Sequence, residues 1–154
     1  MKLSTAGKYA IRAMFELALR DGNGPVPAKD LTRSQMIPFE YLEHLLAKLR
    51  KAGLVESIRG VKGGYNLSTS PRKTRIGDIL RAVEGPLELG SCACASSSHV
   101  KCGRAEDCVS RLIMVRLGSE ISRVLDEITL EDLKKEVHGT KPHLKDRHLV
   151  ACSL

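Results

Sequence analysis

The sequence predicts a mainly helical protein with one small β-hairpin and a long helix towards the C-terminal end. Three observations predict this fold class. Apolar residues recur at helical spacing through most of the first 52 residues, two short β-prone runs flank a glycine-rich tip, and a second apolar stripe covers residues 108–128. The order helix, helix, turn, helix, strand, tip, strand is that of a winged helix-turn-helix. A length of 154 residues suits one such domain with an appended helix.

The first helix is predicted over residues 5–20. Ser4 or Thr5 can cap its start, and the DGNGP segment at 21–25 ends it. An i, i+3, i+4, i+7, i+8 pattern of apolar residues predicts its buried face, which we expect to consist of Ile11, Met14, Phe15, Ala18 and Leu19.

A helix-turn-helix is predicted next. Residues 28–34 are helical by composition, residues 35–37 form a turn, and Pro38 suits the first turn of a helix over 38–52, which Gly53 ends. The buried face of this helix is expected at Leu42, Leu45, Leu46 and Leu49. Its opposite face carries Glu40, Glu43, His44, Lys48, Arg50 and Lys51.

The wing is predicted as a hairpin. Residues 54–58 and 65–68 are β-prone runs, and they flank a tip at residues 59–64 that contains three glycines. A short helix over 75–84 follows, which Thr74 can cap and which should bury Ile76, Ile79, Leu80 and Val83.

The second half is predicted to contain an irregular loop and two helices. Residues 85–107 are rich in Gly, Pro, Ser and Cys and show no periodicity, which is typical of a functional or disordered loop. Thr129 and Asp132 predict a capping box for a last short helix over 130–137. The expected organisation is a winged DNA-binding domain at 1–84, a cysteine-rich sensor loop at 85–107, a dimerisation helix with its short following helix at 108–137, and a flexible tail at 138–154.

The long helix has an apolar stripe with no obvious partner in the monomer. The stripe consists of Val109, Leu112, Ile113, Leu117, Ile121, Val124, Leu125 and Ile128. Packing against a second copy gives a symmetric homodimer. The alternative is that the stripe packs on the helix at 5–20, and both arrangements can hold together.

The positive charge lies in the first half of the chain. The net charge is +7, and residues 1–75 carry 14 basic and 6 acidic side chains. This asymmetry favours a polyanion-binding module, although a solvated basic surface has the same composition. No apolar run approaches the roughly 18 residues needed to span a bilayer, so no membrane role is expected. No signal peptide is apparent, which predicts a cytoplasmic protein in a reducing compartment.

The second helix of the motif and the wing carry the candidate DNA-binding residues. The start of the helix would meet base edges through Phe39, Glu40, Tyr41, Glu43 and His44, because a glutamate can accept a hydrogen bond from cytosine N4. Lys48, Arg50 and Lys51 lie nearer the other end, where they can reach phosphates. In the wing, Arg59 and Lys62 stand beside Gly63 and Gly64, which suits insertion into a narrow minor groove. The alternatives are a solvated helix face and an exposed glycine hairpin.

Four of the five cysteines lie in residues 92–108. The candidate metal ligands are Cys92, Cys94, Cys102 and Cys108, whereas Cys152 lies in the tail. Thiolates suit iron–sulfur clusters, zinc and Cu(I), so an iron–sulfur site, a structural zinc site and a thiol redox switch are all open, as is the absence of any sensing role. No hydrolase elbow, phosphate loop or zinc-protease motif is present, so we do not expect an enzyme. A thiol or metal-handling enzyme and a protein-interaction module remain as alternative classes.

The segment YLEHLLAKLRKAGLVESIRGVKGGYNLS at 41–68 closely resembles the Rrf-type family of bacterial winged-helix regulators. The start MKLSTAGKYAIRAMFELA, the match ILRAVEGPLEL at 79–89 and TLEDL at 129–133 extend the resemblance over about residues 1–135. The resemblance implies a dimeric DNA-binding transcription regulator. It puts Tyr41, Glu43 and Arg50 in the recognition helix, and it puts Arg59, Gly63 and Gly64 in the wing.

The same resemblance implies an iron–sulfur cluster, 2Fe–2S before 4Fe–4S, with zinc less favoured. Cluster-binding members carry three cysteines in this loop, and Cys102 and Cys108 fit the last spacing. The first spacing would fall on Ser96, so Cys92 or Cys94 must serve instead. The positions of the family's fourth ligand hold Arg111 or Lys8, which leaves the surplus cysteine of the Cys92/Cys94 pair to complete the site.

Overall fold

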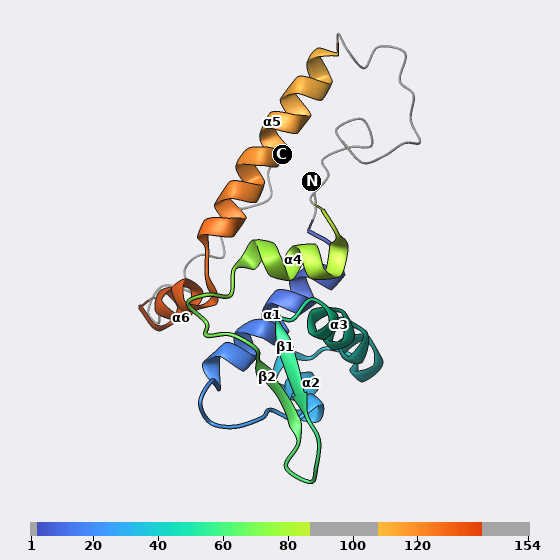
Figure 1. The fold of residues 1–154 in the computed structure, drawn as a ribbon, viewed down its shortest axis with the longest axis vertical. Coiled ribbons are helices and arrows are strands. Elements are labelled where there is room, and N and C mark those ends of the chain that lie inside the picture. Colours follow the sequence, from blue (N-terminus) through green and yellow to red (C-terminus); the bar gives the residue numbers. More distant parts are fainter. Residues whose placement is uncertain (1–2, 87–107, 140–154) are drawn as a thin grey trace.

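The computed structural model of the protein describes residues 3–86 and 108–139. Within them it has six helices and one two-stranded antiparallel sheet, which confirms the mainly helical class with a β-hairpin wing (Figure 1). The elements are α1 (Thr5–Leu19), α2 (Ala28–Gln35), α3 (Phe39–Lys51), β1 (Val55–Ile58), β2 (Gly64–Leu67), α4 (Ile76–Glu84), α5 (Val109–Glu127) and α6 (Leu130–Gly139). The hairpin projects from one end of the helical body and α5 from the other.

The central helix is α1, which contacts α2, α3, α4, α6 and β2. Ser4 caps it as predicted, since its hydroxyl accepts a hydrogen bond of 3.1 Å from the Gly7 amide. The predicted buried face was partly wrong, because Leu19 is exposed and Ile11 and Phe15 are only partly buried. Neighbours on several sides bury a different set, which consists of Gly7, Ala10, Ala13, Met14, Glu16, Leu17 and Ala18.

The core lies where α1, α2, α3 and α4 meet. The predicted inner face of α3 is confirmed, because Leu42, Leu45, Leu46 and Leu49 are all buried. The predicted face of α4 is confirmed in the same way. Leu31 of α2, Ile37 of the turn and Leu130 of α6 complete this core.

The hairpin pairs Val55 with Leu67 and Ile58 with Gly64. Gly64 therefore belongs to a strand, whereas the sequence had suggested that it lies in the tip. Its neighbour Tyr65 also pairs with Val26, whose amide donates to the Tyr65 carbonyl at 3.0 Å while the Tyr65 amide donates back at 2.9 Å. This bridge ties the wing to the segment that leads into α2.

Two predictions about helix starts had different outcomes. The capping box is confirmed, because the Thr129 amide donates to Asp132 Oδ2 at 3.1 Å and the Asp132 amide donates to Thr129 Oγ1 at 3.2 Å. The proposed Thr74 cap of α4 is wrong. The Thr74 hydroxyl donates instead to the Ser70 carbonyl at 3.2 Å, and Arg75 precedes the helix without a side-chain cap. Thr74 is buried, so its hydroxyl satisfies a nearby carbonyl and not the helix.

The long helix α5 packs against α4 and does not lie along α1. Only its inner side is partly covered: Leu125, with Ile128 just beyond the helix, packs against the core cluster. The following helix α6 runs to Gly139, two residues beyond its predicted end. The rest of the tail and residues 87–107 of the predicted loop lie outside the described residues.

Candidate nucleic-acid interface

The exposed side of α3 holds every residue that the sequence singled out on this helix. Its outward residues are Phe39, Glu40, Tyr41, Glu43, His44, Lys48, Arg50 and Lys51. At 100° per residue, Glu40, His44 and Lys51 fall on the middle of this surface, opposite the buried leucines. Tyr41 and Lys48 share one flank because they are seven residues apart, and Phe39 and Arg50 lie towards the other.

Tyr41 contacts α1 on its flank of the helix. Its ring lies edge-on to Tyr9, with centroids 5.7 Å apart and planes at 82°. The guanidinium of Arg12 lies 5.6 Å from the centre of the same Tyr9 ring and donates to the backbone carbonyl of Gln35. The start of α3, the turn before it and α1 are therefore held together by one group of polar and aromatic contacts.

A buried carboxylate supports that turn. Glu16 accepts from Arg20 Nε at 2.8 Å on one oxygen and from Gln35 Nε2 at 2.8 Å on the other. A buried charge is tolerated only when it is paired and hydrogen-bonded, and both conditions are met here. Sequence reasoning missed this group. The available signal was an acidic residue inside an apolar helix, four residues before an arginine.

The three cations near the end of α3 differ in their surroundings. Lys48 Nζ donates to the carbonyl of Val83 in α4 at 2.9 Å, so its charge is used within the fold. Arg50 Nη1 donates to the hydroxyl of Ser57 in β1 at 3.3 Å, which places its guanidinium between α3 and the wing. Lys51 is exposed on the middle of the outward surface. Arg50 and Lys51 are thus the better placed pair for phosphates.

The wing presents its two cations at the tip. Arg59 and Lys62 are exposed in the loop between β1 and β2. The hairpin itself also requires Gly63 and Gly64 to be glycines. A side chain on Gly63 would collide with the Ile58 carbonyl, and one on Gly64 would collide with the backbone of Val26 and Pro27.

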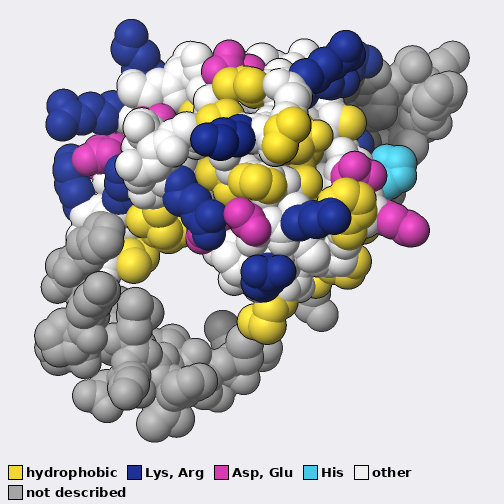
Figure 2. Space-filling view, turned by 90° about the horizontal axis from the view of Figure 1, so that it is seen from below, with side chains coloured by type: hydrophobic (Ala, Val, Ile, Leu, Met, Phe, Trp, Pro, Cys, Tyr) yellow, Lys and Arg dark blue, Asp and Glu magenta, His cyan; other side chains and the backbone are white. Residues whose placement is uncertain are grey.

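Figure 2 shows the molecule from the end at which the wing projects. Lys and Arg side chains are spread over this face, with Asp and Glu and exposed hydrophobic side chains between them. A mixed surface of this kind suits base reading combined with phosphate contacts better than it suits a purely electrostatic polyanion groove. On this face the Lys and Arg side chains therefore stand at separate points and do not form one continuous patch.

Of the four candidate metal ligands, only Cys108 is among the described residues. It precedes the first turn of α5, its thiol is free, and it is half-buried. Cys92, Cys94 and Cys102 lie outside the described residues, which hold no group of three or more His, Cys, Asp or Glu able to bind a metal. The position fits a cluster ligand, because a thiol is the donor that iron prefers in such clusters and this one is accessible.

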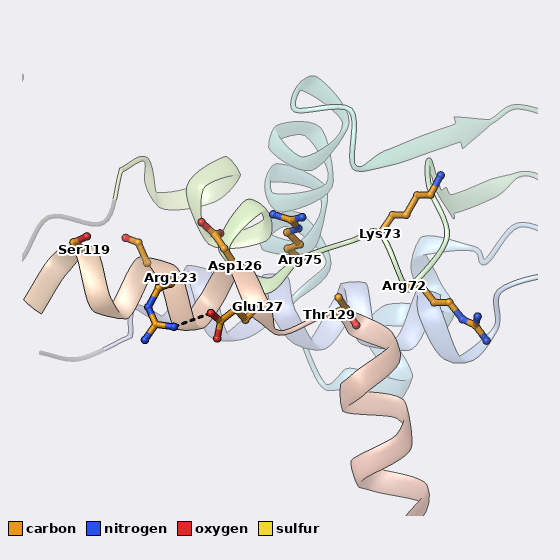
Figure 3. Close-up of a pocket in the computed structure, with 9 residues that line it drawn as sticks. Arg72, Lys73, Arg75, Ser119, Arg123, Asp126, Glu127 and Thr129 are labelled. Atoms are coloured by element: carbon orange, nitrogen blue, oxygen red, sulfur yellow. Dashed lines mark hydrogen bonds and ion pairs between the residues drawn. The ribbon is translucent and has the colours of Figure 1, made fainter.

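A cavity of about 820 Å³ lies between residues 72–75 and the second half of α5. Its walls include Arg72, Lys73, Arg75, Arg123, Asp126 and Glu127. Figure 3 shows Arg72 and Lys73 pointing away from α5, while Arg123 is joined to Glu127 on α5 itself. Because these cations diverge, the cavity does not form a compact anion site. Within the described part of the chain, no helix has the length and apolar character needed to cross a membrane.

The helical core, the exposed third helix and the hairpin beside it define a winged helix-turn-helix protein of the DNA-binding class. The sequence profile of the Rrf2 family, described as an iron-dependent transcriptional regulator, matches residues 3–136. The chain belongs to the Rrf2 family of transcriptional regulators, which confirms the resemblance drawn from the sequence. It is a regulator and not an enzyme.

Two curated relatives illustrate the range of the family. The chain is 39% identical to the HTH-type transcriptional regulator CymR of Bacillus subtilis over 139 residues, which cover 90% of this chain and 94% of CymR. It is 40% identical to the regulator IscR of Aliivibrio salmonicida over an aligned length of 156 residues, gaps included. The alignment covers 100% of this chain and 88% of IscR.

Solved structures agree with this assignment. IscR of T. potens superposes with a TM-score of 0.75 at 38% identity, over 92% of this chain and 91% of that one. CymR of B. subtilis, described as its global cysteine regulator, superposes with a TM-score of 0.68 at 37% identity, over 86% of this chain and 95% of that one.

Proposed function

We propose that this regulator acts as a homodimer that binds an operator through α3 and the wing and senses iron–sulfur or redox status through its cysteines. The observation that carries the dimer is the uncovered apolar surface of α5. Val109, Leu112, Ile113, Val115, Leu117 and Val124 are each between 46% and 70% exposed. A second α5 offers the matching surface by two-fold symmetry, and its burial removes this apolar area from water.

Operator reading is assigned to two elements of each subunit. The outward surface of α3 enters the major groove, where Glu40 and Glu43 can accept from cytosine N4. Arg50 and Lys51 contact phosphates at the other end of the helix. The wing places Arg59 in the adjacent minor groove, where narrow A·T-rich sequence attracts an arginine. Two-fold symmetry then requires half-sites about 34 Å apart, one turn of the duplex.

The cysteines are proposed to hold an iron–sulfur cluster, 2Fe–2S before 4Fe–4S. Cys102, Cys108 and one of Cys92 and Cys94 supply three thiolates, and the remaining cysteine of that pair supplies the fourth. When bound, the cluster supplies a centre that changes with iron, oxidants or nitric oxide. The chain's own contribution is to place the Cys108 thiol next to the first turn of α5, so that ligation at Cys108 would act on the dimerisation helix.

A second candidate is a regulator of the same fold that senses thiol chemistry without a cluster. The free, half-buried thiol of Cys108 favours it, as does the relationship to CymR, described as a global cysteine regulator. In this case Cys92 or Cys94 would form a disulfide with Cys102 or Cys108 on oxidation. A structural zinc site is a less favoured third form of the same idea.

The deciding experiment is anaerobic purification with a visible absorption spectrum and iron and sulfide assays. We expect a coloured protein whose iron and sulfide fall in Cys108→Ser and persist in the matched control Cys152→Ser. A colourless, iron-free protein after reconstitution would contradict the cluster. Operator affinity measured with and without a thiol oxidant then tests the second candidate. Sedimentation of the same samples tests the dimer independently of either.

A further inference from the structure

One ion pair joins the DNA-binding part of the chain to the long helix. Arg81 of α4 donates from Nη2 to Asp126 Oδ1 at 2.5 Å and from Nη1 to Asp126 Oδ2 at 3.2 Å. The same guanidinium donates to Asp78 Oδ1 at 2.8 Å, which holds it on the surface of α4. Hydrogen bonds to the two carboxylates raise the pKa of Arg81 above its ordinary value. Two parallel bonds between planar groups fix an orientation as well as a distance.

The α4 surface at this point is shaped for the carboxylate. A side chain on Gly77 would collide with Asp126 Oδ1, so glycine allows α5 to come close to α4 here. Figure 3 shows Asp126 reaching towards α4, whereas Arg123 and Glu127 lie on a different side of α5. Asp126 thus makes its contacts away from the ion pairs that α5 forms within itself.

The end of α5 is held beside this pair by backbone bonds. The Ile76 amide donates to the Ile128 carbonyl at 3.0 Å, and the Leu130 amide donates to the Thr74 carbonyl at 3.0 Å. These bonds fix where α5 ends, and both lie beyond its last turn. Among the described helices, α4 makes the main contact with α5, and Leu125 with Ile128 adds apolar packing on the core cluster. Of these contacts, the Arg81–Asp126 pair is the one that holds an orientation through two hydrogen bonds.

A small change of direction at this point has a large effect at the far end. A 19-residue helix is about 28 Å long at 1.5 Å per residue. A tilt of roughly 10° at its base would therefore move its other end by roughly 5 Å. One base pair of DNA advances about 3.4 Å along the axis. A change of this size in the tilt of α5 relative to α4 would thus be large enough to alter the half-site spacing that fits the protein.

We propose that Arg81 and Asp126 are positioning residues that set the separation of the two recognition helices, and with it the half-site spacing that the dimer accepts. The inference rests on the proposed homodimer through α5. Each subunit carries one such pair between its DNA-binding part and its dimerisation helix, so any error in the angle occurs twice. Because the pair is partly exposed, it contributes little to the free energy of unfolding. Its contribution is to the angle between α4 and α5.

The test uses the full-length dimer and an operator selected by the wild-type protein from a random DNA library. Binding is compared on that operator and on versions with one base pair inserted or removed between the half-sites. The variants are Arg81→Gln, which removes the donor, and Gly77→Ala, which displaces the carboxylate while favouring the helical state of α4. Arg123→Gln is the matched control, because both partners of Arg123, Glu120 and Glu127, lie on α5 itself.

We expect the wild type and Arg123→Gln to bind the operator with the selected spacing about tenfold or more tighter than the two altered operators. A tenfold difference in affinity corresponds to about 1.4 kcal/mol. Arg81→Gln and Gly77→Ala should lose most of this preference or shift it to another spacing. Arg81→Lys, which keeps a charged donor without the fork, should fall between them. If the pair had only a structural role, the variants would have a lower melting temperature and would bind all three operators more weakly by the same factor.

Unchanged spacing preference in Arg81→Gln and Gly77→Ala dimers would overturn this inference and leave the proposed function intact. A wild-type protein that sediments as a monomer on and off DNA would overturn the proposed dimer, and the inference with it. Sedimentation of every variant separates these outcomes.

Discussion

Lys48 of α3 donates a hydrogen bond of 2.9 Å to the carbonyl of Val83 in the last turn of α4. The last carbonyls of a helix have no partner within it and form the negative end of its dipole, so a lysine there is favourable. The contact joins α3 to the end of α4, from which the chain continues into residues 87–107 and three of the four candidate cysteine ligands. Lys48 therefore links α3 to the end of α4 that precedes this segment.

This contact predicts different effects for two neighbouring lysines. Lys51→Met should reduce the slope of log affinity against log salt concentration by about 0.9 per subunit, because it removes a phosphate contact. Lys48→Met should leave that slope unchanged and destabilise the protein by about 1 kcal/mol. Filter binding over a salt series and urea unfolding measure both quantities. A reduced salt slope in Lys48→Met would show that this lysine contacts DNA after all.

The wing predicts a loss of shape reading. Arg59→Ala should weaken operator binding and remove the preference for A·T over G·C sequence at the flanks of each half-site, since the arginine responds to minor-groove width. Affinities for A·T-flanked and G·C-flanked operators measure the preference. Lys62→Ala is the control, expected to weaken both operators alike. Equal binding of Arg59→Ala and wild type to the two operators would contradict the wing assignment.

The core predicts a large cost on the inner face of α3. Leu46 is fully buried, and Leu46→Ala should destabilise the domain by about 2–5 kcal/mol through lost burial and a residual cavity. Leu19→Ala makes the same chemical change at an exposed site in α1 and should cost well under half as much. Urea unfolding gives both free energies. Similar costs at the two sites would mean that the face of α1 is buried as the sequence first suggested.

The capping box predicts a pH-dependent contribution. Hydrogen bonds from the Thr129 hydroxyl and amide lower the pKa of Asp132 below its ordinary value. The unfolded chain therefore takes up this proton at higher pH than the folded one. The stabilisation is complete above the ordinary aspartate pKa, near 3.9, and is lost as pH falls through the lower folded value. The difference in urea midpoint between wild type and Asp132→Asn should shrink from pH 7 to pH 3. A constant difference would contradict it.

Much of the fold could be predicted from sequence because its signals are local. The leucines of α3 repeat at helical spacing, the glycines mark a hairpin, and Thr129 and Asp132 are three residues apart. Predictions were poorer for residues with neighbours on several sides. The α1 face was misplaced because a central helix is buried over a broad arc, and the Thr74 hydroxyl found a carbonyl of its own loop that no pattern indicated.

The candidate site divides in the same way. Its residue types and exposed positions on α3 and the wing follow from the sequence. An amphipathic helix buries its apolar face, so the residues of the opposite face are the ones exposed to a partner. The different roles of the α3 cations do not, since they depend on what lies beside each one. Tyr41 against Tyr9, Arg50 against Ser57 and Lys48 against Val83 are all consequences of packing.

The sequence by itself determined the element order, the hairpin, the apolar stripe of α5 and the positions of the cysteines. Only the tertiary structure decided which charges are used inside the fold and how α5 is held. Helical and strand patterns are properties of ten or twenty consecutive residues. The contacts of Lys48 with Val83 and of Arg81 with Asp126 join residues 35 and 45 positions apart, and such pairs exist only once the helices have packed.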